Sequence, residues 1–547
     1  MLPSVPMRTS EQNDSTDLPT ATAASPTATA ASPTATAAFP TASVANAPAR
    51  LMRTATTLFA VCIAAGGAIA AHGQEPDNPS VLPVRNLVCE AAGEPFPALK
   101  YAFHLSIDKR MPGNAATFYY RAALLLGSMP PESRKEFYDG YDRWLKLPLD
   151  ELPVDEVRKQ VAGFDGVLNE LRKASTRESC EWNLALGELK GPETIALLLP
   201  EVQEMRNAAR VLRLKAQLQI AEGDFDGAIE TLRMGYQLGI DVAETPILIN
   251  GLVGIAIVSM MNDGVREMID TPDSPNLYWA LAALPERPFD LRRAMQYEMS
   301  VPARLFPFLE DAITAQKTPA EWRREIATAL QQLALWGAMS GSSGPKVSDT
   351  QAELAATALV LARYPQAKKE LIEAGYDEAA VEKMPSAQVV AISASRSYHY
   401  IYGEMFKWTL LPYWQAHDQF ERTEAKLERE GYWGKGAMSR EVLPITALLM
   451  PAANAAMRAE VRAERDLSVL RTIEALRAHF AATGELPATL DDLDNLPAPR
   501  NPITGDPFVY RVADGKAILD APPPRGVAPL HGGYQYVIEI SSKEGAK

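Results

Sequence analysis

Histidine and cysteine are both scarce in this sequence. Its 547 residues include six His and three Cys, and the histidines are scattered without an HExxH or other metal-binding spacing. No cysteine has a CxxC partner, which argues against a structural zinc site or a dithiol redox site. The GxSxG, P-loop and GxGxxG motifs of common hydrolases and nucleotide-binding enzymes are also absent. We therefore expect neither a metal ion nor a cofactor.

Positive charge is limited as well. Lys and Arg total 54 against 68 Asp and Glu, which gives a net charge of −14 without any local run of basic residues. A protein that binds nucleic acid needs a concentrated basic face to neutralise the phosphates. The composition therefore argues against a nucleic-acid partner and fits an acidic, soluble protein.

The chain begins with two segments that do not read as part of a fold. Residues 1–51 contain a repeated unit of Ala, Thr, Ser and Pro, which has almost nothing to bury, so we predict a disordered leader. Residues 52–73 have the pattern of a secretory signal peptide, with Arg53 before an apolar stretch and a small-residue cleavage site ending at Ala70. Met52 is then a candidate initiator. The alternative is an uncleaved membrane anchor through 54–71, which the short, glycine-broken run supports less well.

Removal of the signal peptide leaves two cysteines, Cys89 and Cys180. An exported chain with an even number of cysteines invites a disulfide. Closing a loop of roughly 90 residues contributes about 4 kcal/mol in the chain-entropy model. Two separately buried thiols are the alternative, and the sequence leaves both open.

Helical periodicity dominates residues 74–450, which we expect to form an α-helical domain of stacked hairpins. The clearest pair is a helix that ends at Gly223 and a second that begins near Phe225, both with apolar residues at helical spacing. Such a pair is an αα-hairpin. It resembles one tetratricopeptide repeat, although no clear second copy follows at the period of that repeat. The next run, Ile247–Met261, is the most apolar of the mature chain and is expected to be a central buried helix.

In residues 451–547 the sequence pattern changes from helical periodicity to a long helix followed by strands. A long helix is expected over about Ala452–Ala481, and Asp514-Gly515 between two apolar alternations predicts a β-hairpin. Residues 534–540 predict a third strand with one apolar face, which must cover something. We therefore predict a small α+β module, a three-stranded antiparallel sheet packed on the long helix.

Three stretches carry a resemblance to known proteins. They are LPEVQEMRNAARVLRLKAQLQIAEGDFDGAIETLRMGYQLG, PDSPNLYWALAALP and IEALRAHFAATGELPATLDDLDNLPAPRNPITGDPFVYRV. The chain resembles a group of uncharacterised secreted proteins of planctomycete-type bacteria over most of residues 86–540. The resemblance implies export and a shared helical architecture, and it assigns no activity. The tail alone also resembles the soluble domain of type II secretion pseudopilins, but the long helix is internal, so pilus assembly is not implied.

Two groups of aromatic residues are candidate binding residues. Tyr278 and Trp279 lie in SPNLYWALAALPERP, where Ser274 and the flanking prolines predict a helix of about ten residues. The two rings are about 100° apart around that helix, so they cannot both lie at the centre of its buried face. The second group is His399 with Tyr398 and Trp408. For both groups, packing within the fold is the simpler interpretation, and an aromatic recognition surface is the functional one.

Candidate acids are too numerous to select from the sequence. A glycoside hydrolase needs two carboxyl groups a few ångströms apart in a cleft, and Glu181, Glu188 and Glu298 are three of many conceivable choices. The SxxK spacing of penicillin-binding enzymes occurs at Ser106–Lys109, but the KTG motif of those enzymes is missing.

These observations lead to one functional hypothesis and one alternative. We expect a non-catalytic, exported binding or scaffold protein of the periplasm or cell envelope, whose partner is a protein or an envelope component. The alternative is an envelope hydrolase that acts on glycan or peptide at an acidic site without a known motif. The alternative predicts a deep cleft lined by two acids or by a His–acid pair.

Overall fold

The fold is mainly helical, with a small sheet that contains the C-terminal strands, as predicted. The computed structural model describes residues 82–188, 200–339, 347–432, 446–525, 527 and 532–542. The predicted leader and signal peptide, at 1–51 and 52–73, lie outside these residues.

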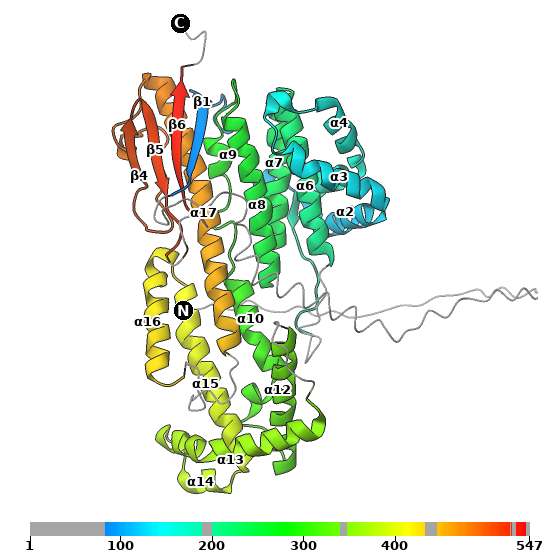
Figure 1. Ribbon diagram of the computed structural model, residues 1–547, viewed down its shortest axis with the longest axis vertical. Helices are drawn as coiled ribbons and strands as arrows, with labels where there is room; N and C mark the ends of the chain where they lie inside the picture. The colour runs from blue at the N-terminus through cyan, green and yellow to red at the C-terminus, as the bar shows by residue number, and fades with distance from the viewer. Residues whose placement is uncertain are drawn as a thin grey trace, which may run out of the picture. The chain divides into compact units, whose positions relative to one another are not determined.

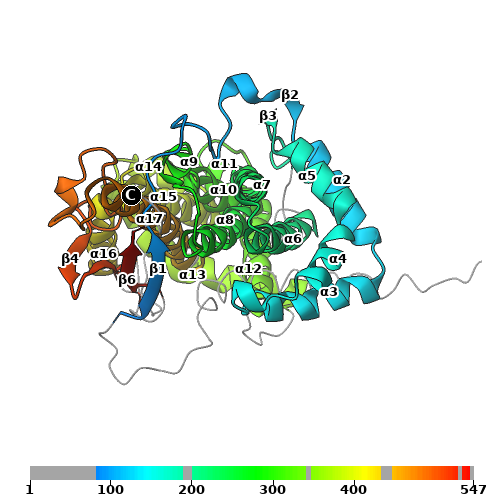
Figure 2. The same cartoon turned by 90° about the horizontal axis from the view of Figure 1, so that it is seen from above.

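Four helices form an outer layer around the next two helices along the chain. Figure 2 shows the outer helices curving around the inner pair. Between the two layers lies an apolar core in which Tyr119, Phe137 and Trp144 are buried. A two-stranded parallel sheet, β2 (Met111–Asn114) with β3 (Arg177–Ser179), joins the two ends of this layer. The outer helices are α2 (Ala116–Ser128), α3 (Pro131–Trp144), α4 (Val154–Ala162) and α5 (Asp165–Ala174), and the inner pair is α6 (Pro200–Ala221) with α7 (Phe225–Ala243).

The α6–α7 pair is the αα-hairpin that the sequence predicts. Gly223 has a φ of 75°, a left-handed conformation that glycine adopts without strain. The Asp224 carboxylate then accepts a hydrogen bond from the Gly227 amide at 3.0 Å and caps α7. The turn is therefore fixed by local chemistry, which is why it is visible in the sequence.

Helix α8 (Leu248–Ile269) packs against α6 and α7 and is the central helix of the protein. It approaches α7 very closely, because a Cβ atom on Gly254 would lie 2.4 Å from the carbonyl oxygen of Gly239. In the described part of the chain, α8 alone is long and apolar enough to cross a membrane by length and composition, and more than half of its most apolar stretch is buried inside the protein.

A second group of helices has its own apolar core, in which Phe306 and Trp322 are buried. Thr318 and Glu321 form a capping box, since each backbone amide donates to the other residue's side chain. The group consists of α10 (Arg292–Leu305), α11 (Phe308–Asp311), α12 (Pro319–Met339), α13 (Asp349–Glu373), α14 (Glu378–Lys383) and α15 (Ser386–Thr409). Helix α16 (Tyr413–Arg429) packs against α15 and contributes to a separate apolar cluster.

The long helix α17 (Thr446–Thr483) lies against the sheet on one side and against α8 on another (Figure 1). The predicted hairpin is present as β4 (Val509–Ala513) and β5 (Lys516–Ala521), with Asp514 and Gly515 at φ values of 52° and 73°. Both central residues of this turn thus have positive φ, as a type I′ turn requires. The third predicted strand is β6 (Tyr534–Ser541), antiparallel to β5.

The sheet has a fourth strand that the sequence analysis missed. Residues Val84–Glu90 form β1, which pairs in parallel with β6, so the strand order is β1-β6-β5-β4. The prediction of a three-stranded, purely antiparallel sheet is therefore wrong. The parallel partner of β1 is about 450 residues away, so no turn sequence beside β1 indicates the pairing. The hairpin strands, in contrast, are predicted by the turn that connects them.

Cys89 and Cys180 are free thiols, so the possible disulfide between them is not formed. Cys89 lies on β1 in the core shared by the sheet and α17, whereas Cys180 packs against the separate core of α2 to α7. Burial raises the pKa of the Cys89 thiol to about 12 and raises that of Cys180 further. The two residues are therefore separate thiols, Cys89 buried and Cys180 partly buried, as in the second interpretation.

Candidate functional site

The segment around Tyr278 and Trp279 is mostly loop, which corrects the predicted ten-residue helix. Only α9 (Tyr278–Ala282) is helical. The Asn276 side chain donates to the carbonyl oxygens of Ala92 at 3.0 Å and Glu474 at 2.8 Å, while its oxygen accepts from the Tyr278 amide. Asparagine bonded in this way holds the backbone out of a helix, so the helix begins two residues later.

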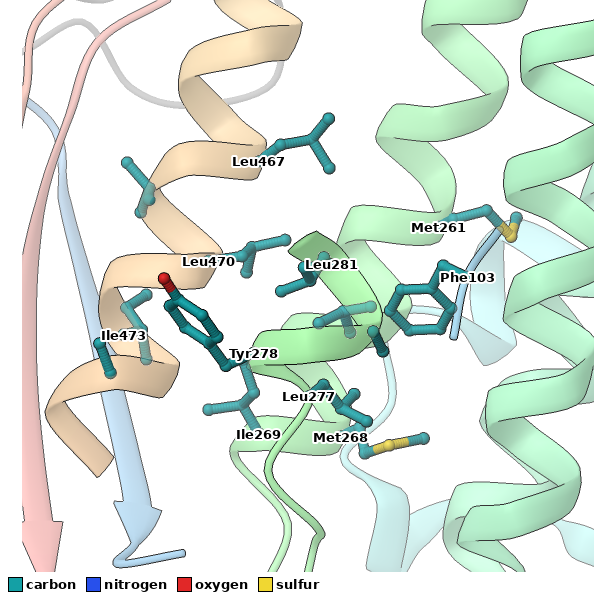
Figure 3. Packing of buried hydrophobic residues seen from close by; sticks show 14 of the residues in the cluster. Phe103, Met261, Met268, Ile269, Leu277, Tyr278, Leu281, Leu467, Leu470 and Ile473 are labelled. Carbon is teal, nitrogen blue, oxygen red and sulfur yellow. The ribbon is translucent and has the colours of Figure 1, made fainter. Parts of the chain in front are cut away.

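The two neighbouring rings have different surroundings. Tyr278 is 1% exposed, and its hydroxyl donates to the Pro497 carbonyl at 2.8 Å. Figure 3 shows its ring directed toward Leu470 and Ile473 of α17. Trp279 is half-buried, and its Nε1 donates to Glu94 at 2.6 Å. Tyr278 is thus a core residue, and only Trp279 reaches the surface.

A surface hollow of about 350 Å³ lies beside this segment, between the loop after β1 and residues 273–276. Its charged side chains already have partners: Lys100 donates to Asp226 at 3.1 Å, and Glu90 accepts from the Asp273 amide at 2.9 Å. Phe96 at its rim is 98% exposed. The hollow offers few unsatisfied polar groups and therefore little specific chemistry.

The second candidate group, His399 with Tyr398 and Trp408, does not form a common cleft. All three lie on α15 but contact different neighbours. The Tyr398 hydroxyl donates to the Met299 carbonyl, and Trp408 Nε1 donates to Thr423 at 2.8 Å. His399 lies between the Ser395 carbonyl, 2.9 Å from Nδ1, and Glu310, 3.5 Å from Nε2. These residues hold α15 against the helices around it.

A different cavity, which we call the acid pocket, has more distinctive chemistry. It has a volume of about 120 Å³ and is lined by residues of α10, the start of α16 and α17. Glu460 and Glu464 of α17 line it together with Arg287, Tyr413 and Trp414. Its remaining lining is mostly apolar and includes Met295, Leu411, Met457 and Val461.

Simple local rules place these side chains. Glu460 and Glu464 are four residues apart on one helix, so their Cβ atoms lie roughly 5–6 Å from each other on the same face. Pro412 precedes the first turn of α16, which carries Tyr413 and Trp414. The Trp414 ring also covers Gly505, where a Cβ atom would lie 2.8 Å from the ring. The loop that follows the long helix therefore supports one wall of the pocket.

The two carboxyl groups are held in an unfavourable setting for negative charge. Burial raises the pKa of Glu460 to about 8, and the neighbouring Glu464 and Asp290 raise it as well, while Arg287 and Arg292 lower it. Burial also raises the pKa of Glu464 to about 7, with Arg287 acting in the opposite direction. Near neutral pH, each group can therefore gain or lose a proton.

Neither carboxyl group has a hydrogen bond or an ion pair to any residue that the structure describes. The neighbouring Arg292 is already paired with Asp290, because its Nε donates to Asp290 Oδ1 at 2.6 Å. Buried charged groups in proteins are normally paired. Among the described residues, this pocket combines two partly buried, unpaired carboxyl groups with aromatic and apolar side chains, and we therefore take it as the candidate functional site.

Sequence reasoning missed this pair among the many acidic residues. One signal was present, because like charges four residues apart destabilise a helix and Met457 and Val461 flank them with apolar side chains. The other acids considered for hydrolysis are elsewhere: Glu298 accepts from the Leu248 amide. Within the described part of the chain, no group of three or more His, Cys, Asp or Glu residues is arranged to hold a metal ion.

Comparison of the chain with protein-family models, with curated proteins and with solved structures found no match. The interpretation of the acid pocket therefore rests on its own geometry and chemistry.

Proposed function

We propose that this chain is an exported, non-catalytic binding protein of the periplasm or cell envelope, and that the acid pocket is its ligand site. The observation that carries the proposal is the cavity of about 120 Å³ with two unpartnered carboxyl groups on one wall and Tyr413 and Trp414 on another. A cavity of on the order of 150 Å³ holds a molecule of the size of benzene. The export part of the proposal is supported by the signal-peptide pattern at 52–73.

The envelope hydrolase is the second candidate, because two acids with raised pKa values on one cavity wall fit part of its requirement. A glycoside hydrolase needs one protonated acid and one ionised carboxylate on either side of the bond that is cleaved. Here both pKa values are raised, and both acids lie on one face of one helix. The cavity is also smaller than the roughly 300–1,000 Å³ of pockets that take larger ligands. These features favour binding over catalysis.

The test is a fragment screen by ligand-observed NMR with the purified protein. Leu411 lines the pocket and is 38% exposed, so Leu411→Trp should fill the cavity without disturbing the core. We expect small fragments that bind the wild-type protein to lose binding in this variant, with an unchanged circular dichroism spectrum. Fragments that bind both proteins equally would show that the acid pocket is not the ligand site.

The hydrolase is tested in the same preparations with peptidoglycan fragments and glycan oligomers. We expect no turnover. Turnover that disappears in Glu464→Gln and persists in Glu428→Gln, a change of an exposed acid on α16, would establish the second candidate instead. N-terminal sequencing of the protein from the periplasmic fraction should find cleavage after Ala70, and recovery of the uncleaved chain from the cytoplasm would contradict export.

A further inference from the structure

We propose that the acid pocket binds a small organic cation, with a primary ammonium group between Glu460 and Glu464 and its apolar part against Trp414 and Met295. This inference rests on the proposed function, because it names the class of ligand for the same pocket.

The pocket has one more negatively charged group than positively charged group when both carboxyls are ionised. Glu460 and Glu464 line the cavity, and Arg287 is the one basic residue among the described residues that line it. Asp290 and Arg292, at the start of α10, neutralise each other through their ion pair. One monovalent cation together with Arg287 would therefore balance the two carboxylates.

The shape of the pocket selects an organic cation. A primary ammonium group has three donors on one centre, which suits two carboxylates that approach from one side. Aromatic faces attract ammonium and alkylammonium groups, and Tyr413 and Trp414 also line the cavity. Met295 and Met457 add an apolar surface. A calcium ion would need six to eight oxygen ligands, whereas Glu460 and Glu464 are the two carboxylates among the described residues that line this pocket.

Ligand binding should be linked to the protonation of the pocket. The groups that face Glu460 are Glu464 on its own helix, and Arg287, Asp290 and Arg292 from the adjoining loop and α10. Glu464 is affected in addition by Glu286. A bound ammonium group favours the ionised form of both carboxyls, so binding releases protons near neutral pH. Affinity for a cation should therefore increase as the pH rises through the pKa values of about 7 and about 8.

The experiment is isothermal titration calorimetry with three probes of similar shape: benzylamine, benzyl alcohol and benzoate. We expect benzylamine to bind at about pH 8.5 at least about tenfold more tightly than benzyl alcohol, and benzoate not to bind, because one charge–charge contact in a partly buried site is worth at least that factor. At about pH 6, where both carboxyls are protonated, benzylamine should bind about tenfold more weakly.

Variants of the two carboxyl groups test whether they bind the ammonium group. Glu460→Gln and Glu464→Gln should each weaken benzylamine binding about tenfold and leave benzyl alcohol binding unchanged, while Glu428→Gln should behave as the wild-type protein. Both pocket variants remove a carboxyl group that burial disfavours, so they should fold at least as well as the wild-type protein.

Two results would overturn the inference. Equal binding of benzylamine and benzyl alcohol, lost in Leu411→Trp, would show a pocket for neutral ligands and leave the proposed function in place. If none of the three probes binds, the inference that the pocket binds an organic cation is also wrong. The fragment screen would then decide separately whether the pocket binds any ligand.

Discussion

Glu474 and Arg477 form an ion pair in the interior of the protein, with 2.9 Å between Oε2 and Nη1 and no exposed surface on either side chain. Arg477 also donates to the Glu90 carbonyl at the end of β1 and to the carbonyl and hydroxyl of Ser274, each at 2.9–3.0 Å. One guanidinium group thus joins α17, the sheet and the loop before α9.

Replacing that arginine should strongly destabilise the protein. Arg477→Met leaves Glu474 buried without its partner, so we expect a loss of about 3–5 kcal/mol in the free energy of unfolding, measured with urea. Arg143→Met is the control, because its ion pair with Glu156 is exposed and should contribute no more than about 1 kcal/mol. The double variant Glu474→Gln/Arg477→Met should lose less than Arg477→Met alone. Similar losses for Arg477→Met and Arg143→Met would contradict the role of the buried pair.

The contact between α7 and α8 makes a second prediction. Gly254→Ala would place a Cβ atom 2.4 Å from the Gly239 carbonyl oxygen, so one helix must move, at an expected cost of about 1–3 kcal/mol. Gly403→Ala on α15 is the matched control, since no atom lies within 4 Å of its Cβ position. That change should stabilise the protein by about 0.5–1 kcal/mol. Thermal unfolding measures both, and equal melting temperatures would show that the two helices are not in close contact.

A buried carboxyl group predicts how stability depends on pH. Asp241 accepts from the Tyr119 hydroxyl at 2.6 Å and from Gln237 at 2.8 Å, and burial raises its pKa from 3.8 to about 7. The folded protein therefore keeps this proton between those two values, while the unfolded chain loses it. The contribution of this group to stability is complete below about pH 4 and decreases as the pH rises to about 7, by about 4 kcal/mol.

Asp241→Asn isolates this contribution, because it keeps an acceptor for Tyr119 and cannot titrate. Urea unfolding at about pH 5 and about pH 8 should show a smaller loss of stability with pH in the variant than in the wild-type protein. Asp139→Asn, a change of an exposed acid, should retain the wild-type dependence. The same dependence in all three proteins would show that Asp241 is ionised throughout.

The thiols provide a direct check on the fold. Alkylation without reductant, followed by mass spectrometry, should label both Cys89 and Cys180 after denaturation. In the native protein, labelling should be slow, because burial raises both thiol pKa values and the thiolate is the reactive form. A peptide pair linked by a disulfide would contradict the separation of the two residues into different cores.

The parts of the fold that could be predicted are those fixed by neighbouring residues. The turn at Gly223 and Asp224 and the hairpin at Asp514-Gly515 are each decided within a few residues, and both are confirmed. The helix predicted from Ser274 is wrong, because Asn276 bonds to carbonyl groups of residues far away in the sequence. Strand β1 was missed for a similar reason, since its partner is distant.

The acid pocket was out of reach of the sequence for a related physical reason. The sequence places Glu460 and Glu464 on one helical face, but their burial depends on where α10 and the start of α16 pack. The aromatic residues, in contrast, were recognised in the sequence as candidate binding residues, but the structure gives them a different role. Tyr278 and Trp408 are suitable residues for a binding surface, and each is instead engaged in packing contacts within the protein.

The pairing of β1 with β6 sets an order of events during synthesis. Ribosomal synthesis produces Val84–Glu90 about 450 residues before its partner strand Tyr534–Ser541. Helices α2 to α7 can pack while synthesis continues, because their contacts are closer in sequence. The sheet cannot form until β6 has been synthesised, and until then β1 lacks its hydrogen-bonding partner. A chain that stops before β6 should therefore contain a folded helical part and an unpaired, aggregation-prone β1, so synthesis of β6 also protects the protein from aggregation.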